Sequence, residues 1–337
     1  MNRLRSNIRS DERVVFFATD AARVGPTWQI PIHAWVHELE PARKRKAMLA
    51  SLIEHAIGLE IADEARAYFE RRVGLMCADN EGRKRIILHI ADQQLALPLT
   101  TSNGHVRTTL VLDADLVARH ARSGLLPLGT VLPDGRQATG AARLIPSAGL
   151  SVISDIDDTV KITEVLDKTA MIRRTFLEPF VSVPGMSSLY QHWAARGACL
   201  HFVSSSPWHL YEPLEELLDR DGFPARSMSL KMVRIKDRTV MNLLKKGTQT
   251  KPAQIEPILE RFPQRRFILV GDSGEQDPEV YAKILRAYPA QIQAICIRNV
   301  DQSMADDLRY QSAFEGIDPQ RWCLFTDPAA LQPLVVP

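Results

Sequence analysis

The chain has 337 residues, of which 45% are hydrophobic and 24% are charged, and its formal net charge is +2. This composition predicts a globular protein with about two domains and excludes the strong positive charge of many nucleic-acid-binding proteins, so no nucleic-acid partner is expected. The four cysteines lack metal-binding spacing, which favours free thiols in a reducing compartment. No signal peptide or bilayer-spanning run is evident, so we expect a cytoplasmic protein whose contact with membranes can only be peripheral.

The first 148 residues show the period-two alternation that is typical of β-strands. Such strands are predicted at Val14–Ala18, Trp28–Glu38, Arg85–Ile90, His105–Leu112 and Ala138–Leu144. A Pro-Asp-Gly turn at residues 133–135 indicates a hairpin. Residues 42–75 have helical spacing, with Pro41 at the start and a break at Gly58. We therefore expect residues 1–148 to form a small β-rich domain, antiparallel and sandwich-like, with a helical hairpin at residues 42–75.

After a junction at residues 146–149, apolar strands alternate with helices. The predicted strands are Val152–Ser154, Ala198–Val203, Phe267–Gly271, Gln291–Ile297 and Trp322–Phe325. The predicted helices are Gly185–Arg196, Pro207–Asp221, Pro252–Phe262 and Asp277–Ala287. Parallel strands need crossover helices, so this alternation predicts an α/β domain at residues 149–337 with a doubly wound, mostly parallel sheet.

The first strand of this domain ends in an unusual concentration of acids. Gly149 precedes a short apolar run, and Asp155, Asp157 and Asp158 follow it. Ligands bind at the carboxyl ends of strands in open α/β sheets. Carboxylates crowded there repel one another and raise each other's pKa values, and a multivalent cation would relieve that repulsion. Asp155 and Asp157 are therefore the first candidates for chemistry.

The next two strands also end in polar loops. Ser204, Ser205 and Ser206 precede a helix at Pro207, where the hydroxyls and backbone amides can hold phosphate or form an ordinary N-cap. Asp272 and Asp277 flank the loop after the third strand. Asp277 can cap the following helix, support a metal held by Asp272, or do both.

Lys251 lies just before the predicted helix Pro252–Phe262, which leads into the third strand. It is either a solvated charge or a partner for a transferring phosphoryl group. Lys245 and Lys246 compete for that role. The ordered set of Asp-x-Asp-x-Thr, Ser, Lys and Gly-Asp-x-x-x-x-Asp, each in its strand-to-loop context, indicates phosphoryl transfer.

This set resembles the haloacid dehalogenase superfamily. Four segments, at residues 154–161, 183–186, 203–208 and 269–281, together with Ile297-Arg298, resemble more specifically the catalytic domain of the actin-patch-protein family of phosphatidate phosphatases. The resemblance covers residues 149–330. It implies a magnesium-dependent phosphatase that converts phosphatidate to diacylglycerol through an aspartyl-phosphate. Related lipid-binding domains lack the catalytic acids, whereas this sequence keeps Asp155 and Asp157.

The resemblance also implies roles for the residues. Asp155 is the expected nucleophile and Asp157 the general acid and base. Asp158 and the Thr159 hydroxyl are expected to serve the structure of the loop. The expected Mg²⁺ site consists of Asp155, the main-chain carbonyl of Asp157, Asp272 and, through water, Asp277, and the phosphate oxygens are expected to contact Ser204, Ser205 and Lys251.

Several other features leave two interpretations open. The apolar residues of Thr169–Val183 either pack on the core or contact a lipid surface beside Arg173 and Arg174. Residues 231–251 hold seven basic residues against one acid, which indicates a solvated face or attraction to anionic membranes. The basic run at residues 43–46 is read as a solvated helix end, and His33 and His37 as surface or packing residues.

The substrate is not fixed by the motifs, because shared chemistry lies in the loops and specificity in the surrounding surface. A lipid phosphate such as phosphatidate is the leading prediction. The alternatives are a soluble phosphomonoester or a phosphoprotein as substrate, or a non-catalytic module that senses phosphatidate.

Overall fold

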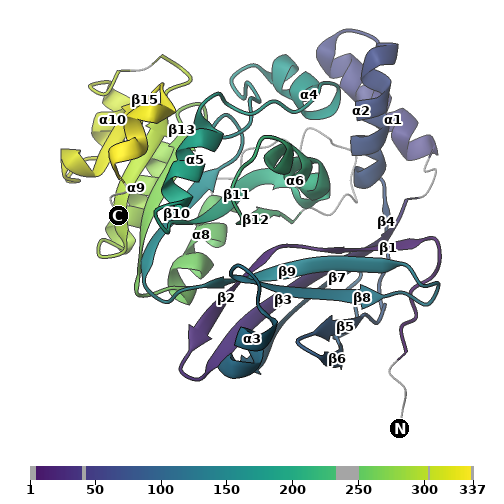
Figure 1. Ribbon diagram of the computed structural model, residues 1–337. Helices are drawn as coiled ribbons and strands as arrows, with labels where there is room; N and C mark the ends of the chain where they lie inside the picture. Colours follow the sequence, from purple (N-terminus) through teal and green to yellow (C-terminus); the bar gives the residue numbers. More distant parts are fainter. Residues whose placement is uncertain (1–4, 40–42, 233–249, 303, 335–337) are drawn as a thin grey trace. The chain divides into compact units, whose positions relative to one another are not determined.

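The computed structural model describes residues 5–39, 43–232, 250–302 and 304–334 (Figure 1). The chain divides into two compact units, one of Met1–Arg43 and Gly74–Ser147 and the other of Lys44–Val73 and Ala148–Pro337. Among the described residues, no helix combines the length and the apolar character needed to cross a membrane.

The first unit is built on one nine-stranded sheet. Its elements are β1 (Glu12–Phe16), β2 (Thr19–Val24), β3 (Thr27–Glu38), β4 (Asp79–Asn80), β5 (Ile87–Ile90), β6 (Gln93–Ala96), β7 (His105–Asp113), α3 (Ala114–His120), β8 (Leu125–Val131) and β9 (Gln137–Ile145). The strand order is β1-β3-β2-β9-β8-β5-β6, with β4 and β7 also paired to β3. The prediction of purely antiparallel pairing was wrong for β2 and β9, which run parallel. These two strands are far apart in the sequence, so no hairpin turn constrains their direction.

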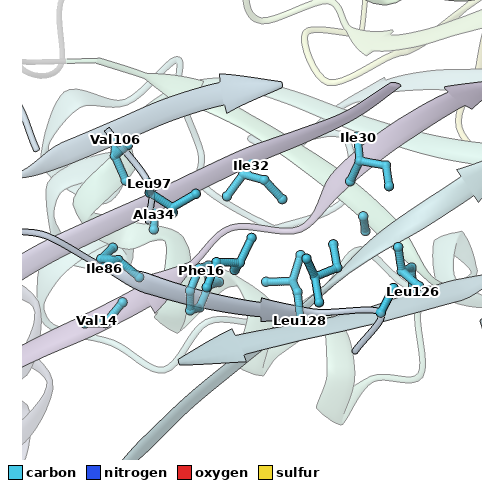
Figure 2. Close-up of a cluster of buried hydrophobic side chains, with 14 of the residues drawn as sticks. Val14, Phe16, Ile30, Ile32, Ala34, Ile86, Leu97, Val106, Leu126 and Leu128 are labelled. Carbon is cyan, nitrogen blue, oxygen red and sulfur yellow. The ribbon is translucent and has the colours of Figure 1, made fainter. Parts of the chain in front are cut away.

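Alternating side chains of these strands form the core of the unit. Ile30, Ile32 and Ala34 of β3 gather with Val14 and Phe16 of β1, as Figure 2 shows, together with residues of β7 and β8. Because side chains alternate between the two faces of a strand, the period-two pattern of the sequence marks this face directly. The predicted hairpin joins β8 to β9, where Leu132 N–H donates to the carbonyl of Arg136 at 2.8 Å.

The predicted helical hairpin is formed by α1 (Arg43–Ile57) and α2 (Asp63–Met76). Gly58 ends the first helix with a φ of 69°, a conformation that glycine adopts without steric cost. Most of the hairpin groups with the second unit rather than the first. Pro41, the predicted start, lies outside the described residues.

The second unit contains a six-stranded, fully parallel sheet in the order β12-β11-β10-β13-β14-β15. Its strands are β10 (Gly149–Asp155), β11 (Cys199–Pro207), β12 (Arg226–Lys231), β13 (Arg265–Asp272), β14 (Ile292–Arg298) and β15 (Trp322–Phe325). The helices are α4 (Lys168–Phe176), α5 (Met186–Ala194), α6 (Tyr211–Arg220), α8 (Thr250–Arg261), α9 (Asp277–Ala287) and α10 (Leu308–Ala313). This confirms the α/β, doubly wound fold.

The strand order fixes where a ligand can bind. From β10 the chain continues to β11 and β12 on one side, whereas from β13 it continues to β14 and β15 on the other. Right-handed crossovers then place α5 and α6 on one face of the sheet and α8 and α9 on the other (Figure 1). The strand order therefore reverses between the adjacent strands β10 and β13, and their carboxyl ends flank a crevice.

Candidate active site

Asp155 and Asp272 are the last residues of β10 and β13, the two strands at this reversal. Their exposed fractions are 1% and 0%. Asp272 Oδ1 accepts hydrogen bonds from the amides of Gly274, at 2.7 Å, and Glu275, at 3.1 Å. In contrast, Asp272 Oδ2 and both oxygens of Asp155 accept no hydrogen bond from any residue that the structure describes. Buried carboxylate oxygens without donors are costly. Asp155 Oδ1 is offset only by an ion pair with Lys251, so Asp155 Oδ2 and Asp272 Oδ2 are the atoms that indicate room for a further cation.

Glu275 completes a group that fits a metal ion. Asp155, Asp272 and Glu275 each offer one oxygen, and these oxygens all lie within 4.8 Å of one another. Carboxylate oxygens are the ligands that hard divalent cations such as Mg²⁺ prefer. Glu275 was not among the metal ligands predicted from the sequence. Its position in the same short loop as Asp272, three residues further on, is the signal that could have identified it.

Lys251 and Asp277 border this group. The Lys251 ammonium lies 3.0 Å from Asp155 Oδ1, in an ion pair without hydrogen-bond geometry, and 3.1 Å from Glu275 Oε2. It also contacts Asp277 Oδ1. Asp277 Oδ2 accepts from the Asp272 amide at 3.2 Å. The sequence-predicted Asp155, Asp272, Asp277 and Lys251 are therefore neighbours, and the side chain of Asp277 holds Lys251 and the end of β13.

Burial and like charge dominate the electrostatics. Burial raises the pKa of Asp155 well above its usual value, and the neighbouring carboxylates raise it further although Lys251 opposes them. Burial, followed by Asp277, likewise raises the pKa of Asp272. Burial alone would lower the pKa of Lys251, but Asp155, Asp277 and Glu275 outweigh it and raise that pKa well above 10.5. The site thus has more negative charge than its lysine balances, as a cation site requires.

Asp157 follows β10 but its carboxylate has a different set of partners. Oδ1 lies 2.9 Å from the Lys161 ammonium and accepts a hydrogen bond from the Thr163 hydroxyl at 2.9 Å. Oδ2 accepts from the Ser204 hydroxyl at 2.9 Å and from the Ser206 hydroxyl at 2.8 Å. Burial would raise the pKa of Asp157, but Lys161 and these hydrogen bonds hold it well below its usual range.

These contacts bear on the predicted phosphate-binding residues. The Ser204 hydroxyl donates to Asp157 and accepts from the Ser206 amide at 2.9 Å, so phosphate binding would require it to exchange partners. Ser205 is half-buried at the end of β11. Lys161 and Thr163 were not selected from the sequence, because a basic residue and a hydroxyl near a motif are common without any role. Ser206 was named only as part of the serine run and not as a partner of Asp157.

The loop after β10 is stabilised by Asp158. Its carboxylate accepts from the amides of Thr163, Glu164 and Val165 at 2.7, 2.8 and 2.6 Å, which confirms a structural role. The expectation that the Thr159 hydroxyl braces the loop was wrong, since that buried hydroxyl has no hydrogen-bond partner within the described part of the chain. The Asp158 carboxylate, which accepts from three backbone amides, supplies the bracing instead.

The remaining surface interpretations have mixed outcomes. Ile172 and Phe176 of α4 are buried, while Arg173 and Arg174 pair with Glu178, so core packing is confirmed for this helix. His33 and His37 are packing residues, stacked on Phe17 and Trp35 respectively. Lys245, Lys246 and most of the basic run at 231–251 lie outside the described residues.

The parallel sheet and the buried carboxylates at its reversal of strand order have the arrangement that the resemblance to haloacid dehalogenase phosphatases led us to expect. Residues 150–299 match the sequence model described as "Phosphatidate phosphatase APP1, catalytic domain". This part of the second unit is therefore similar to that catalytic domain, as the sequence motifs predicted.

Two curated relatives match this half of the chain. Phosphatidate phosphatase APP1 of Saccharomyces cerevisiae is 34% identical over 173 residues, and an uncharacterised protein of Schizosaccharomyces pombe is 31% identical over 175 residues. These segments are 50% and 51% of this chain but only 29% of each relative. The chain thus spans less than a third of the length of either relative.

Solved structures show weaker likeness. A putative β-phosphoglucomutase from Thermotoga maritima has a TM-score of 0.35 and 15% identity, covering 55% of this chain and 97% of that one. A D,D-heptose 1,7-bisphosphate phosphatase from B. bronchiseptica has a TM-score of 0.31 and 13% identity, covering 55% and 96%. Likeness at this level has no weight for function.

Proposed function

We propose that this protein is a Mg²⁺-dependent phosphatase that hydrolyses a phosphomonoester, phosphatidate in the first place, through an aspartyl-phosphate. The observation that carries the proposal is the state of Asp155. Its carboxylate is buried at the reversal of strand order, beside Asp272 and Glu275, and neither oxygen is used in a hydrogen bond. Such a carboxylate costs stability and serves no packing purpose, which is typical of functional sites.

The reaction uses the two aspartates in two steps. The donors around Asp157 keep it ionised in the free protein, so it first takes up a proton as Ser204 turns from Asp157 to the substrate phosphate. One oxygen of Asp155 then attacks phosphorus, the bond from phosphorus to the ester oxygen breaks, and the leaving alkoxide takes that proton from Asp157. Water then attacks the aspartyl-phosphate while Asp157 accepts its proton, which releases inorganic phosphate and restores both carboxyl groups. An unprotonated alkoxide is a poor leaving group, so the acid is needed in the first step.

Asp155, Asp272 and Glu275 fit a magnesium ion, together with the main-chain carbonyl of Asp157 as the resemblance implies. When bound, Mg²⁺ supplies positive charge that offsets the charge of the phosphoryl group. Lys251 adds a second cation beside Asp155, and Asp277 fixes Lys251. Ser204 and Ser205 are proposed to meet the phosphate oxygens, Ser204 after it releases Asp157.

Phosphatidate is the proposed substrate because the APP1-type catalytic domain is described by that activity and the relative from Saccharomyces cerevisiae has the same name. A membrane lipid must be reached at a surface, so we include peripheral contact with anionic membranes and a cytoplasmic location in the proposal. The alternatives are a soluble phosphomonoester or phosphoprotein substrate and a non-catalytic phosphatidate-binding module.

Phosphate release tests these choices directly. The purified chain is assayed with Mg²⁺ on phosphatidate in vesicles, on a water-soluble phosphomonoester and on a phosphopeptide. We expect release from phosphatidate, loss of release after chelation, and no turnover by Asp155→Asn, whose melting temperature should stay near that of wild type. A preference for either soluble substrate would replace phosphatidate, and vesicle binding without any hydrolysis would support the non-catalytic module. Wild-type turnover by Asp155→Asn would contradict the nucleophile assignment.

A further inference from the structure

The two oxygens of Asp157 face chemically different partners. Oδ1 meets Lys161 and Thr163, whereas Oδ2 meets the hydroxyls of Ser204 and Ser206 at the end of β11. A lysine ammonium has donors but no acceptor, whereas a serine hydroxyl can turn and accept as well as donate. Oδ2 can therefore carry a proton, which a serine hydroxyl can accept as a hydrogen bond, whereas Oδ1 faces an ammonium that cannot accept one.

Lys161 is fixed in this place from several sides. Its side chain is 2% exposed, and its ammonium lies 2.9 Å from Asp157 Oδ1 and 5.0 Å from the centre of the Phe180 ring. Its amide donates to the Ile156 carbonyl at 2.8 Å, and its own carbonyl accepts from the Asp158 amide at 2.7 Å. Burying an ammonium is costly unless it is paired, so this lysine is committed to Asp157.

The Lys161 ammonium sets which oxygen of Asp157 can carry a proton. The Thr163 hydroxyl accepts from this ammonium at 2.5 Å, and its single proton can go to Asp157 Oδ1 at 2.9 Å or to the Lys161 carbonyl at 3.3 Å. In either case the ammonium beside Oδ1 can only donate. Oδ1 thus always faces the ammonium as a donor, and a proton on Asp157 is accommodated on Oδ2.

We propose that Lys161, acting with Thr163, is a positioning residue that assigns the proton transfers of Asp157 to Oδ2. This inference rests on the proposed phosphatase function. In the first step, Oδ2 gives its proton to the alkoxide as the phosphorus–oxygen bond breaks and the bond to Asp155 forms. In the second step, Oδ2 takes a proton from the attacking water. Throughout, Lys161 and Thr163 hold Oδ1 and so hold the side-chain rotamer.

Leaving-group dependence separates this role from a merely structural one. An alkyl phosphate needs a proton on its leaving oxygen, whereas the p-nitrophenolate of p-nitrophenyl phosphate leaves without one. For Lys161→Met we expect kcat/KM to fall by about ten- to a hundredfold with the alkyl phosphate and by less than about threefold with the aryl phosphate. In an Asp157→Asn background, the same change should have little further effect, because both act on one step.

Thr163→Val gives a second test if Lys161→Met does not fold, since it keeps the ion pair and removes only the hydroxyl. It should show the same substrate selectivity in smaller measure, and Thr163→Ser should restore wild-type behaviour. Arg226→Met is the matched control. Arg226 is a buried basic residue paired with Glu215 and Asp219 at the opposite end of the sheet, so it should lower stability without changing the alkyl-to-aryl ratio.

The outcomes are distinct. Equal losses on both substrates, or full additivity with Asp157→Asn, would show that Lys161 only stabilises the fold and would overturn the inference while leaving the phosphatase intact. A wild-type protein that releases phosphate from neither ester, nor from phosphatidate, would overturn the proposed function itself.

Discussion

At the residue level, some carboxylate oxygens of the site form hydrogen bonds within the protein, whereas others remain available to a metal ion. Asp272 uses Oδ1 for two backbone amides and leaves Oδ2 without a hydrogen bond. Asp277 uses both oxygens, one for Lys251 and one for the Asp272 amide. The oxygens that remain available to a metal ion belong to Asp155, Asp272 and Glu275. Glu275 is therefore expected to be a metal ligand, although it was not predicted from the sequence.

Glu275→Gln should weaken the binding of Mg²⁺. The change removes one anionic oxygen from the group of three but keeps the size of the side chain, so the fold should be unaffected. We expect the Mg²⁺ concentration needed for half-maximal phosphate release to rise by about tenfold or more. Glu279→Gln is the control, because Glu279 pairs with Arg309 outside the group. An unchanged requirement for Mg²⁺ would remove Glu275 from the site.

At the level of elements, the loop from β13 to α9 depends on one glycine. A Cβ atom on Gly271 would lie 2.2 Å from Asp277 Oδ2 and 2.7 Å from the Asp277 Cβ atom. No heavier residue fits between the strand and the carboxylate that holds Lys251. The glycine is needed here for close approach, and its backbone needs no unusual φ.

Gly271→Ala should therefore displace Asp277 and, through it, Lys251. We expect a loss of about 1–3 kcal/mol in the free energy of unfolding from overpacking, together with a large fall in kcat. Urea unfolding and phosphate release measure the two effects. Wild-type stability and turnover would show that the loop can shift without consequence.

The elements also show where sequence patterns fail. Trp322–Phe325 and Asp277–Ala287 match β15 and α9, because buried parallel strands and capped amphipathic helices have strong local signals. The strand β12, Arg226–Lys231, was not predicted. It has no β-branched residue, and its conformation is stabilised by parallel pairing with β11, a contact that no local pattern encodes.

At the level of the whole molecule, the first unit has its own sensitivity to acid. Burial lowers the pKa of His37 and of His105 to about 3, with Arg13 adding to the effect at His37 and Arg107 at His105. Both rings are buried, and His37 stacks on Trp35 with a centroid distance of 3.6 Å. Folding therefore requires both rings to stay neutral.

The unfolded chain binds protons on these histidines below a pH of about 6.5, whereas the folded unit does not until about pH 3, so stability should fall as pH decreases between these values. The loss at pH 5 is on the order of 2 kcal/mol for each histidine. Hydrogen exchange of β3 peptides at pH 7 and pH 5 measures this loss of stability, once the exchange rates are corrected for the pH dependence of intrinsic amide exchange. His37→Phe should reduce the difference, and His55→Phe, at an exposed position, should not. An equal pH dependence in His37→Phe would contradict the assignment.

The sequence alone determined the α/β alternation, the strand-end positions of Asp155, Ser204 and Asp272, and the similarity of residues 150–299 to a phosphatidate phosphatase catalytic domain. It could do so because strand period, helix spacing and loop motifs are local properties of the chain. Only the tertiary structure decided which atoms are in contact. It places Glu275, rather than Asp277, in the group of carboxylates that could hold a metal ion. It also places Lys161 and Ser206 in contact with the Asp157 carboxylate. Those contacts depend on how neighbouring strands align and how each side chain turns, and burial then sets the charge that each group can hold.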